Sequence, residues 1–133
     1  MGLEAEILNR CHTVAIVGAS RDPERPSNIV ARYLSEHGYN IIPVNPEAET
    51  VLGKTSYPDL ISVPEKIEVA NIFRDPEEVK PIVLEAINIG VEVVWMQEGV
   101  INEEAAAMAR DAGLLVVMNK CIRREHQRLN EGS

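Results

Sequence analysis

Residues 13–28 read TVAIVGASRDPERPSN, an apolar run followed by a glycine and a long polar loop. The run at 14–17 has no alternating polar face, which is typical of a strand buried on both sides in a parallel sheet. Gly18 ends this strand, and the loop after it leads into a helix. A glycine lets backbone approach a ligand closely, and the first turn of a helix offers N–H groups and a positive dipole end. The stretch therefore predicts a phosphate-binding turn.

Four more apolar runs follow along the chain, and helical patterns separate them. The predicted strands are residues 41–44, 69–73, 91–96 and 114–118. Apolar spacing and capping residues predict helices over 3–10, from Ser27 or Asn28 to Gly38, from Asp75 to Gly90, from Asn102 to Gly113, and over 121–129. Pro81 lies inside the third of these helices and predicts a kink or a break. Residues 47–67 are the least regular part, with one helical turn expected at 57–61.

Strand and helix alternate five times, which predicts an α/β fold with a parallel sheet. We expect a Rossmann-like, doubly wound, five-stranded sheet with helices on both faces. Right-handed crossovers make 3-2-1-4-5 the simplest strand order. The chain has 133 residues and no segment that resembles a linker, so the prediction is a single domain over residues 1–133.

Composition excludes several classes of protein. The net charge of −8 argues against nucleic acid as a partner, because a surface that follows phosphates normally carries excess Lys and Arg. No apolar run approaches the roughly 20 residues of a membrane span, and the first residues contain no basic leader, so we expect a cytoplasmic protein. Cys11 and Cys121 are too few for a disulfide framework or a zinc site, which predicts free thiols and no metal.

Ligands of doubly wound sheets bind at the carboxyl ends of the strands, where the strand order reverses. Polar residues and glycines follow each predicted strand at that edge: Gly18-Ala19-Ser20-Arg21, Asn45-Pro46, Arg74-Asp75, Gln97-Glu98-Gly99 and Asn119-Lys120-Cys121. We expect the ligand site here. A side chain at position 18 would occupy the space of a phosphate, so Gly18→Val is expected to abolish binding and to leave the fold largely intact.

The first loop differs from that of a dinucleotide-binding protein. The dinucleotide fingerprint needs G-x-G-x-x-G after the first strand and an acid at the end of the second. Here Gly18 stands alone and the second strand ends at Asn45. The loop is also longer, and it carries Arg21 and Arg25, which favour a heavily phosphorylated ligand. These features disfavour NAD.

Four segments together resemble the small single-domain CoA-binding proteins: VAIVGASRDPERPSNIVARYLSEHGYNIIPVNP, ANIFRDPEEV, VVWMQEG and VVMNKCIRREH. The fold of that family is similar to the CoA-binding domain at the N-terminus of the succinyl-CoA synthetase α subunit. The resemblance covers residues 13–126. It implies that the cofactor is coenzyme A or an acyl-CoA.

The resemblance also implies which residues touch the cofactor. In the family the first loop holds the CoA phosphates, the residues after the second strand contact the nucleotide, and the loops after the third and fourth strands line the pantetheine path. The matching positions here are Gly18, Ala19, Ser20 and Arg21; Asn45 and Pro46; Phe73 and Arg74; and Gln97 and Gly99. Arg25, Ser27 and Cys121 complete the predicted cofactor-binding set.

The sequence contains no recognisable catalytic constellation. His12, His37 and His126 have no carboxylate or serine at a telling spacing, so we predict that the protein is not an enzyme. Cys121 lies at a helix start beside Lys120 and Arg123, surroundings that suit a reactive thiol, and a buried packing role is the alternative. Our first interpretation is a CoA carrier, sensor or regulatory module. The alternatives are an NAD(P)-type nucleotide sensor and an accessory subunit of an acyl-CoA-using enzyme, with a homodimer or an enzyme as the partner.

Overall fold

The computed structural model describes residues 2–131. In this range a parallel sheet contains β1 (Thr13–Val17), β2 (Asn40–Val44), β5 (Val69–Ile72), β6 (Val93–Met96) and β7 (Leu115–Val117). The helices are α1 (Leu3–Arg10), α2 (Pro26–Glu36), α3 (Val79–Ile89), α4 (Glu103–Asp111) and α5 (Ile122–Glu131), and a 3₁₀ turn, η1 (Pro76–Glu78), precedes α3. A hairpin of β3 (Thr50–Val51) and β4 (Lys54–Thr55) follows β2. None of the described helices is long and apolar enough to span a membrane.

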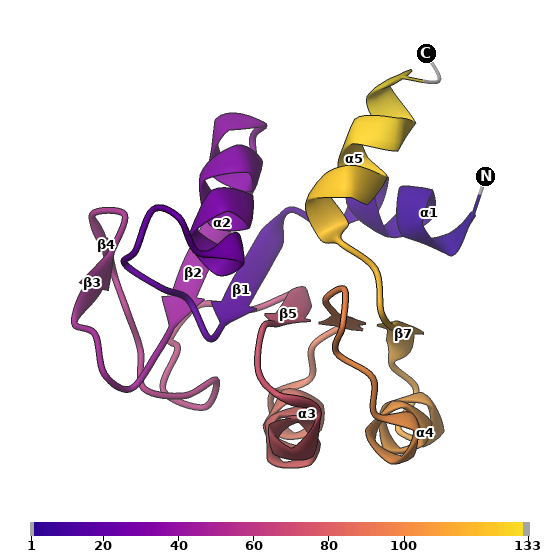
Figure 1. Cartoon of the computed structure of the whole chain (residues 1–133). Coiled ribbons are helices and arrows are strands. Elements are labelled where there is room, and N and C mark those ends of the chain that lie inside the picture. The colour runs from indigo at the N-terminus through magenta and orange to yellow at the C-terminus, as the bar shows by residue number, and fades with distance from the viewer. Residues whose placement is uncertain (1, 132–133) are drawn as a thin grey trace.

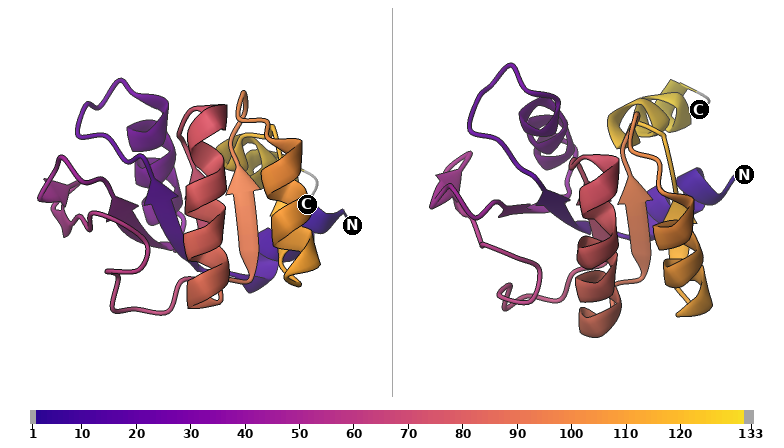
Figure 2. Two further views of the ribbon diagram at one scale, coloured as in Figure 1. Left: turned by 90° about the horizontal axis from the view of Figure 1, so that it is seen from below. Right: turned by 60° about the horizontal axis from the view of Figure 1, so that its bottom comes forward.

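Helices cover both faces of the sheet, as the sequence predicted (Figure 1). The helices α1, α2 and α5 lie on one face, and α3 and α4 lie on the other, as the turned views in Figure 2 also show. Each face has its own core, because alternate residues of a strand point to opposite sides. In β1, Val14 and Ile16 pack toward α1, α2 and α5, whereas Ala15 and Val17 pack toward α3 and α4.

The position of the third long strand differs from the prediction. The sheet order is β2-β1-β5-β6-β7, which is 2-1-3-4-5 when the five strands are counted along the chain. The doubly wound parallel sheet is confirmed, but the predicted order 3-2-1-4-5 placed the third strand beside the second. That outer position belongs to a segment around Tyr57, which forms a parallel bridge with Val44. This segment has no apolar run, so the sequence pattern did not reveal it.

Two helix starts also differ from the prediction. The N-cap of α2 is Arg25 and Pro26 occupies its first turn, so Ser27 and Asn28 lie inside the helix and not at its cap. In the third helical segment the break falls at Glu78, where η1 passes into α3. Pro81 is then in the first turn of α3, where its missing N–H costs no helical hydrogen bond. In place of the expected helical turn at 57–61, Tyr57 forms the bridge to β2 and residues 58–61 form bends and a turn.

His126 joins α5 to α2 within the core. Its side chain is buried, its Nδ1 lies 2.7 Å from the hydroxyl of Tyr33, and its ring packs edge-on against His37 and Tyr39. Burial, followed by the charge of nearby His37, lowers the pKa of His126 below its ordinary value. The folded protein therefore favours the neutral ring.

We predict that acidification below the ordinary histidine pKa of about 6.5 destabilises the fold through this residue. The unfolded chain then binds a proton that the folded chain does not, so stability is full above that pH and falls as pH drops toward the lowered pKa. Thermal unfolding at pH 7.5 and 5.5 measures the loss. His126→Gln should reduce the pH dependence, whereas His12→Gln, at an exposed ring, should keep it. An unchanged pH dependence in His126→Gln would contradict the assignment.

Candidate functional site

Gly18 is the point at which β1 turns into the first loop. Its φ of +91° lies in the region that favours glycine, and its N–H donates to the carbonyl of Val44 at 2.9 Å. A Cβ built at this position would lie 2.8 Å from the carbonyl oxygen of Phe73 and 2.9 Å from Cδ of Arg74. The glycine is therefore needed by the fold itself. The expectation that Gly18→Val leaves the fold intact is wrong, because the added carbon meets the backbone of the neighbouring strand end.

The first loop is held by side chains from the start of α2. The N–H of Ser20 donates to Oγ of Ser27 at 3.1 Å, and Nδ2 of Asn28 donates to the carbonyl of Ser20 at 2.8 Å. Arg32 extends this network by donating to Oδ1 of Asn28 and to the carbonyl of Pro23, both at 2.8 Å. The buried polar residues Ser27 and Asn28 thus fix the loop in place of capping the helix.

Asn45 connects the end of β2 to the same loop. Its Nδ2 donates to the carbonyl of Ala19 at 2.7 Å, while its Oδ1 accepts the N–H of Glu47 at 2.8 Å. Ala19 is buried in the core on the α2 side of the sheet. Ala19 and Asn45 therefore hold the turn through this hydrogen bond, and neither residue lines the cleft at the strand ends.

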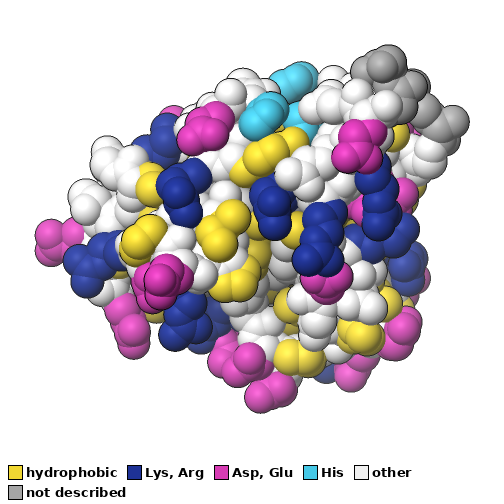
Figure 3. Space-filling model, turned by 45° about the horizontal axis from the view of Figure 1, so that its top comes forward, with side chains coloured by type: hydrophobic (Ala, Val, Ile, Leu, Met, Phe, Trp, Pro, Cys, Tyr) yellow, Lys and Arg dark blue, Asp and Glu magenta, His cyan; other side chains and the backbone are white. Residues whose placement is uncertain are grey.

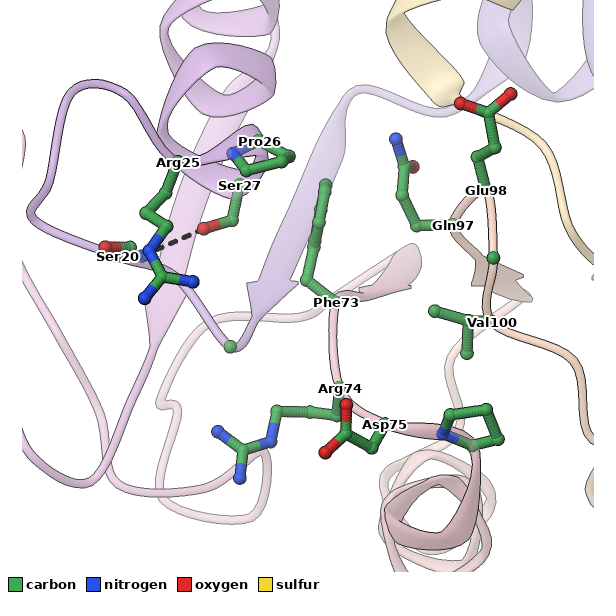
Figure 4. Close-up of a pocket in the computed structure, with 13 residues that line it drawn as sticks. Ser20, Arg25, Pro26, Ser27, Phe73, Arg74, Asp75, Gln97, Glu98 and Val100 are labelled. Atoms are coloured by element: carbon green, nitrogen blue, oxygen red, sulfur yellow. Dashed lines mark hydrogen bonds between the residues drawn. The ribbon is translucent and has the colours of Figure 1, made fainter.

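A cleft of about 420 Å³ opens at the carboxyl ends of β1, β5 and β6 (Figure 4). Its size is typical of a small-molecule or cofactor site. It lies beside the switch point of the sheet, where β2 and β5 leave β1 on opposite sides. Its lining residues are Gly18, Ser20, Arg25, Pro26, Ser27, Phe73, Arg74, Asp75, Pro76, Gln97, Glu98, Gly99 and Val100.

The two sides of the cleft differ in chemistry. In Figure 4 the guanidinium groups of Arg25 and Arg74 lie on the side of the first loop, whereas Phe73, Gln97 and Val100 lie on the other side. Arg74 also donates from Nε to Glu78 at 2.6 Å. The first turn of α2 borders the cleft at Pro26 and Ser27, which adds the positive end of the helix dipole.

Several basic side chains are exposed on the face of α2 and α5, although the whole chain is acidic. Figure 3 shows Lys and Arg side chains around a partly hydrophobic hollow on the face of α2 and α5, with several acidic side chains along its lower margin. Such a local field attracts an anion that the net charge of −8 would repel. The face therefore suits a small anionic ligand.

The loop after β6 is anchored from the neighbouring strand. Oδ1 of Asn119, a residue with φ +61°, accepts the N–H of Gly99 at 2.8 Å. Gln97 is buried, and its Oε1 accepts from the N–H of Ile122 and from Nδ2 of Asn71, both at 3.3 Å. Its amide plane is thereby held between β5 and the start of α5.

Most of the predicted site residues meet at this cleft. Its lining includes Gly18, Ser20, Arg25, Ser27, Phe73, Arg74, Gln97 and Gly99. Pro46 lines a second hollow of about 210 Å³ that shares Gly18 and Arg74 with the cleft. Arg21 is exposed on the first loop. Cys121 lies in a third hollow on the other side of Gln97. The prediction missed Pro26, Pro76 and Val100, whereas Asp75 and Glu98 were expected at this edge of the sheet but were left out of the predicted cofactor-binding set.

A second cluster of ionisable groups lies at the opposite end of the sheet. The sulfur of Cys11 and carboxylate oxygens of Glu68 and Glu92 are within 4.8 Å of one another. Oε1 of Glu68 already accepts the N–H groups of His12 and Thr13, and a guanidinium nitrogen of Arg10 lies 3.8 Å from Glu92. Burial raises the pKa of the Cys11 thiol, which favours its neutral form. These contacts indicate a brace between α1 and the sheet.

The fold and the cleft define a Rossmann-like α/β domain with a cleft beside the switch point of its sheet. A family model described as a CoA binding domain matches residues 12–127, and the chain belongs to this family. The resemblance seen in the sequence is thus confirmed. Both cysteines are free thiols, also as predicted.

Relatives of two kinds are similar to the chain. YneT, an uncharacterized protein of Bacillus subtilis, is 36% identical over 91% of this chain and 90% of its own length. The structure of a hypothetical protein from Pyrococcus horikoshii is 48% identical with a TM-score of 0.93, covering 96% of this chain and 89% of that one. The ADP-forming acetate–CoA ligase II of Archaeoglobus fulgidus is 28% identical over 69% of this chain. The matched part makes up 14% of the length of that ligase.

We predict that Gly18→Ala destabilises the protein more than the same change at Gly38. Both glycines have nearly the same φ, +91° and +90°, but a Cβ at Gly38 meets no atom within 4 Å. Gly38→Ala should therefore cost only the backbone penalty of about 1–2 kcal/mol. Gly18→Ala adds a steric conflict of about 1–3 kcal/mol. Urea unfolding measures both, and equal losses would show that the approach to Phe73 carries no energetic weight.

Proposed function

We propose that the protein binds coenzyme A or an acyl-CoA in the cleft at the carboxyl ends of β1, β5 and β6, as a non-catalytic carrier or sensor. The observation that carries this proposal is the two-sided chemistry of the cleft. Arg25, Arg74 and the first turn of α2 suit phosphates on one side. Phe73, Gln97 and Val100 suit an amide-containing apolar arm on the other. Membership in the CoA-binding family supports the same ligand.

The absence of histidine from the cleft supports a role without catalysis. Within the described residues, the lining of the cleft includes none of His12, His37 and His126. His126 is engaged with Tyr33 between two helices, and His37 stacks on the same tyrosine. A ligase reaction that passes through a phosphorylated histidine would need such a residue near the cofactor. Binding without turnover therefore fits the cleft best.

The ligase relatives support a second candidate function. The chain is similar to one part of two ADP-forming acetate–CoA ligase proteins. It spans 14% of one and 26% of the other. An accessory subunit that presents an acyl-CoA to a partner enzyme would use the same cleft. Light scattering of the purified protein alone, and with an acyl-CoA ligase partner from its own cell, distinguishes a self-sufficient binder from a subunit.

We predict that CoA binds with a dissociation constant in the micromolar range, about −8 kcal/mol, and that NAD binds far more weakly. The reason is the first loop, which carries Arg25 and lacks the dinucleotide glycines. Isothermal titration of CoA, acetyl-CoA, NAD and NADP against one protein preparation tests the proposal. No CoA binding would sink it, and tighter binding of NAD or NADP would favour the nucleotide-sensor alternative.

We predict that Arg25→Gln weakens CoA binding about tenfold and leaves the binding of pantetheine unchanged, because pantetheine has no phosphate. Arg110→Gln is the matched control. Arg110 is exposed in the last turn of α4, outside the cleft, and both changes lower the positive charge by one. Calorimetry at two salt concentrations should show a smaller salt dependence in Arg25→Gln than in the control. Similar CoA affinities in the two variants would remove Arg25 from the site.

A further inference from the structure

A hollow of about 240 Å³ lies between α2 and the start of α5, and we refer to it as the α5 cavity. It shares Pro26, Gln97 and Glu98 with the main cleft, so the two spaces adjoin. Its remaining walls are Ile29, Val30, Cys121, Arg123 and Arg124. A ligand whose phosphates lie beside Arg25 and whose arm reaches Gln97 therefore has direct access to the α5 cavity.

Gln97 presents an unused hydrogen-bond donor at this junction. Its Oε1 accepts the backbone N–H of Ile122, which can only donate, so the orientation of the amide is fixed. Its Nε2 meets no acceptor among residues 2–131, although the side chain is only 6% exposed. In Figure 4 this nitrogen is the outermost atom of the side chain and points between Pro26 and Glu98. This nitrogen is therefore available to donate to a ligand acceptor such as an amide carbonyl.

Arg123, another residue that lines the cavity, also has an N–H group without a partner among the described residues. Nε of Arg123 is buried and makes no hydrogen bond with the described part of the chain. Arg124 lines the cavity too and is paired with Glu98 at 2.9 Å. Cys121 is a buried lining residue of the same cavity and lies directly before α5, where its carbonyl accepts the N–H of Glu125. The free thiol therefore belongs to a residue on the wall of a cavity that also has the Nε2 donor of Gln97 on its lining.

We propose that the α5 cavity receives the sulfur end of the bound cofactor and that Cys121 forms a reversible mixed disulfide with it. This inference rests on the proposed binding of CoA in the main cleft. The oxidant is a low-molecular-weight disulfide, CoA disulfide. The Cys121 thiol loses its proton to solvent, and its sulfur attacks one sulfur of the disulfide. The Cys121–S–S–CoA bond forms as the original S–S bond breaks, and the second CoA leaves as a thiolate that takes up a proton.

Intact-protein mass spectrometry after incubation with CoA disulfide tests the proposal. One CoA-sized adduct should appear on the wild-type chain, disappear with dithiothreitol, and be absent in Cys121→Ser. Cys11→Ser is the matched control, because Cys11 is the other free thiol and lies at the opposite end of the sheet, and it should keep the adduct. Binding of the nucleotide raises the local concentration of the disulfide, so CoA disulfide should react at least about tenfold faster than glutathione disulfide.

The outcomes separate this inference from the proposed function. Circular dichroism of both variants shows that they are folded, and calorimetry with reduced CoA on the wild-type chain reports binding independently of any adduct. If reduced CoA binds and no adduct forms, the mixed disulfide is ruled out and the proposed function stands. An adduct that is lost in Cys11→Ser and kept in Cys121→Ser would show that Cys11 is the reacting thiol, and this result overturns the proposal. If neither binding nor adduct is seen, both proposals fail.

Discussion

The close approach of the ends of β1 and β5 is the constraint on which the cleft depends. The N–H of Phe73 donates to the carbonyl of Val17 at 2.8 Å, and Gly18, the next residue, passes so near to the carbonyl of Phe73 that no side chain fits between them. At this contact the chain leaves β1 and enters the first loop. Arg74, directly after Phe73, lies in the lining of the cleft. The loop then returns to α2 under the control of Ser27 and Asn28. The cleft lies between the first loop and the residues that follow β5 and β6.

The charged and the uncharged residues of the candidate site differ in how far they are exposed. The chain is acidic overall, yet the arginines nearest the first loop, Arg21 and Arg25, stay exposed while Phe73 and Gln97 are drawn inward. In the proposed complex, the exposed arginines can adjust to a flexible polyanion, because their side chains stay free to change rotamer until a ligand fixes them. In the proposed complex, Phe73 and the amide of Gln97 would contact the neutral arm of the ligand. A cofactor with a phosphorylated head and a long neutral arm matches this division of roles.

The sequence predicted the layers of the fold well because its signals are local. Apolar runs such as 14–17 and caps such as Asn102, whose Oδ1 accepts the N–H of Ala105 at 2.9 Å, depend on neighbouring residues only. The place of β5 beside β1 was not predictable in this way, because it depends on the pairing of Val44 with Tyr57 in a segment that lacks any regular pattern. The same limit applies to the site. Position after a strand identified Gly18 and Gln97, but the role of Ser27 required the three-dimensional path of the loop.

The segment around Tyr57 also has a consequence for association between molecules. The outer strand of a sheet presents unpaired backbone groups, and another chain can add to it. Here Tyr57 donates to the carbonyl of Pro43 at 3.1 Å and accepts the N–H of Asn45 at 2.8 Å, while Pro43 itself has no N–H to offer. The end of the outer edge of β2 is therefore already occupied by Tyr57. At the opposite edge of the sheet, β7 has only three residues, so it offers few backbone groups to an added strand. An irregular stretch thus occupies backbone groups at the end of β2 that another chain could otherwise use.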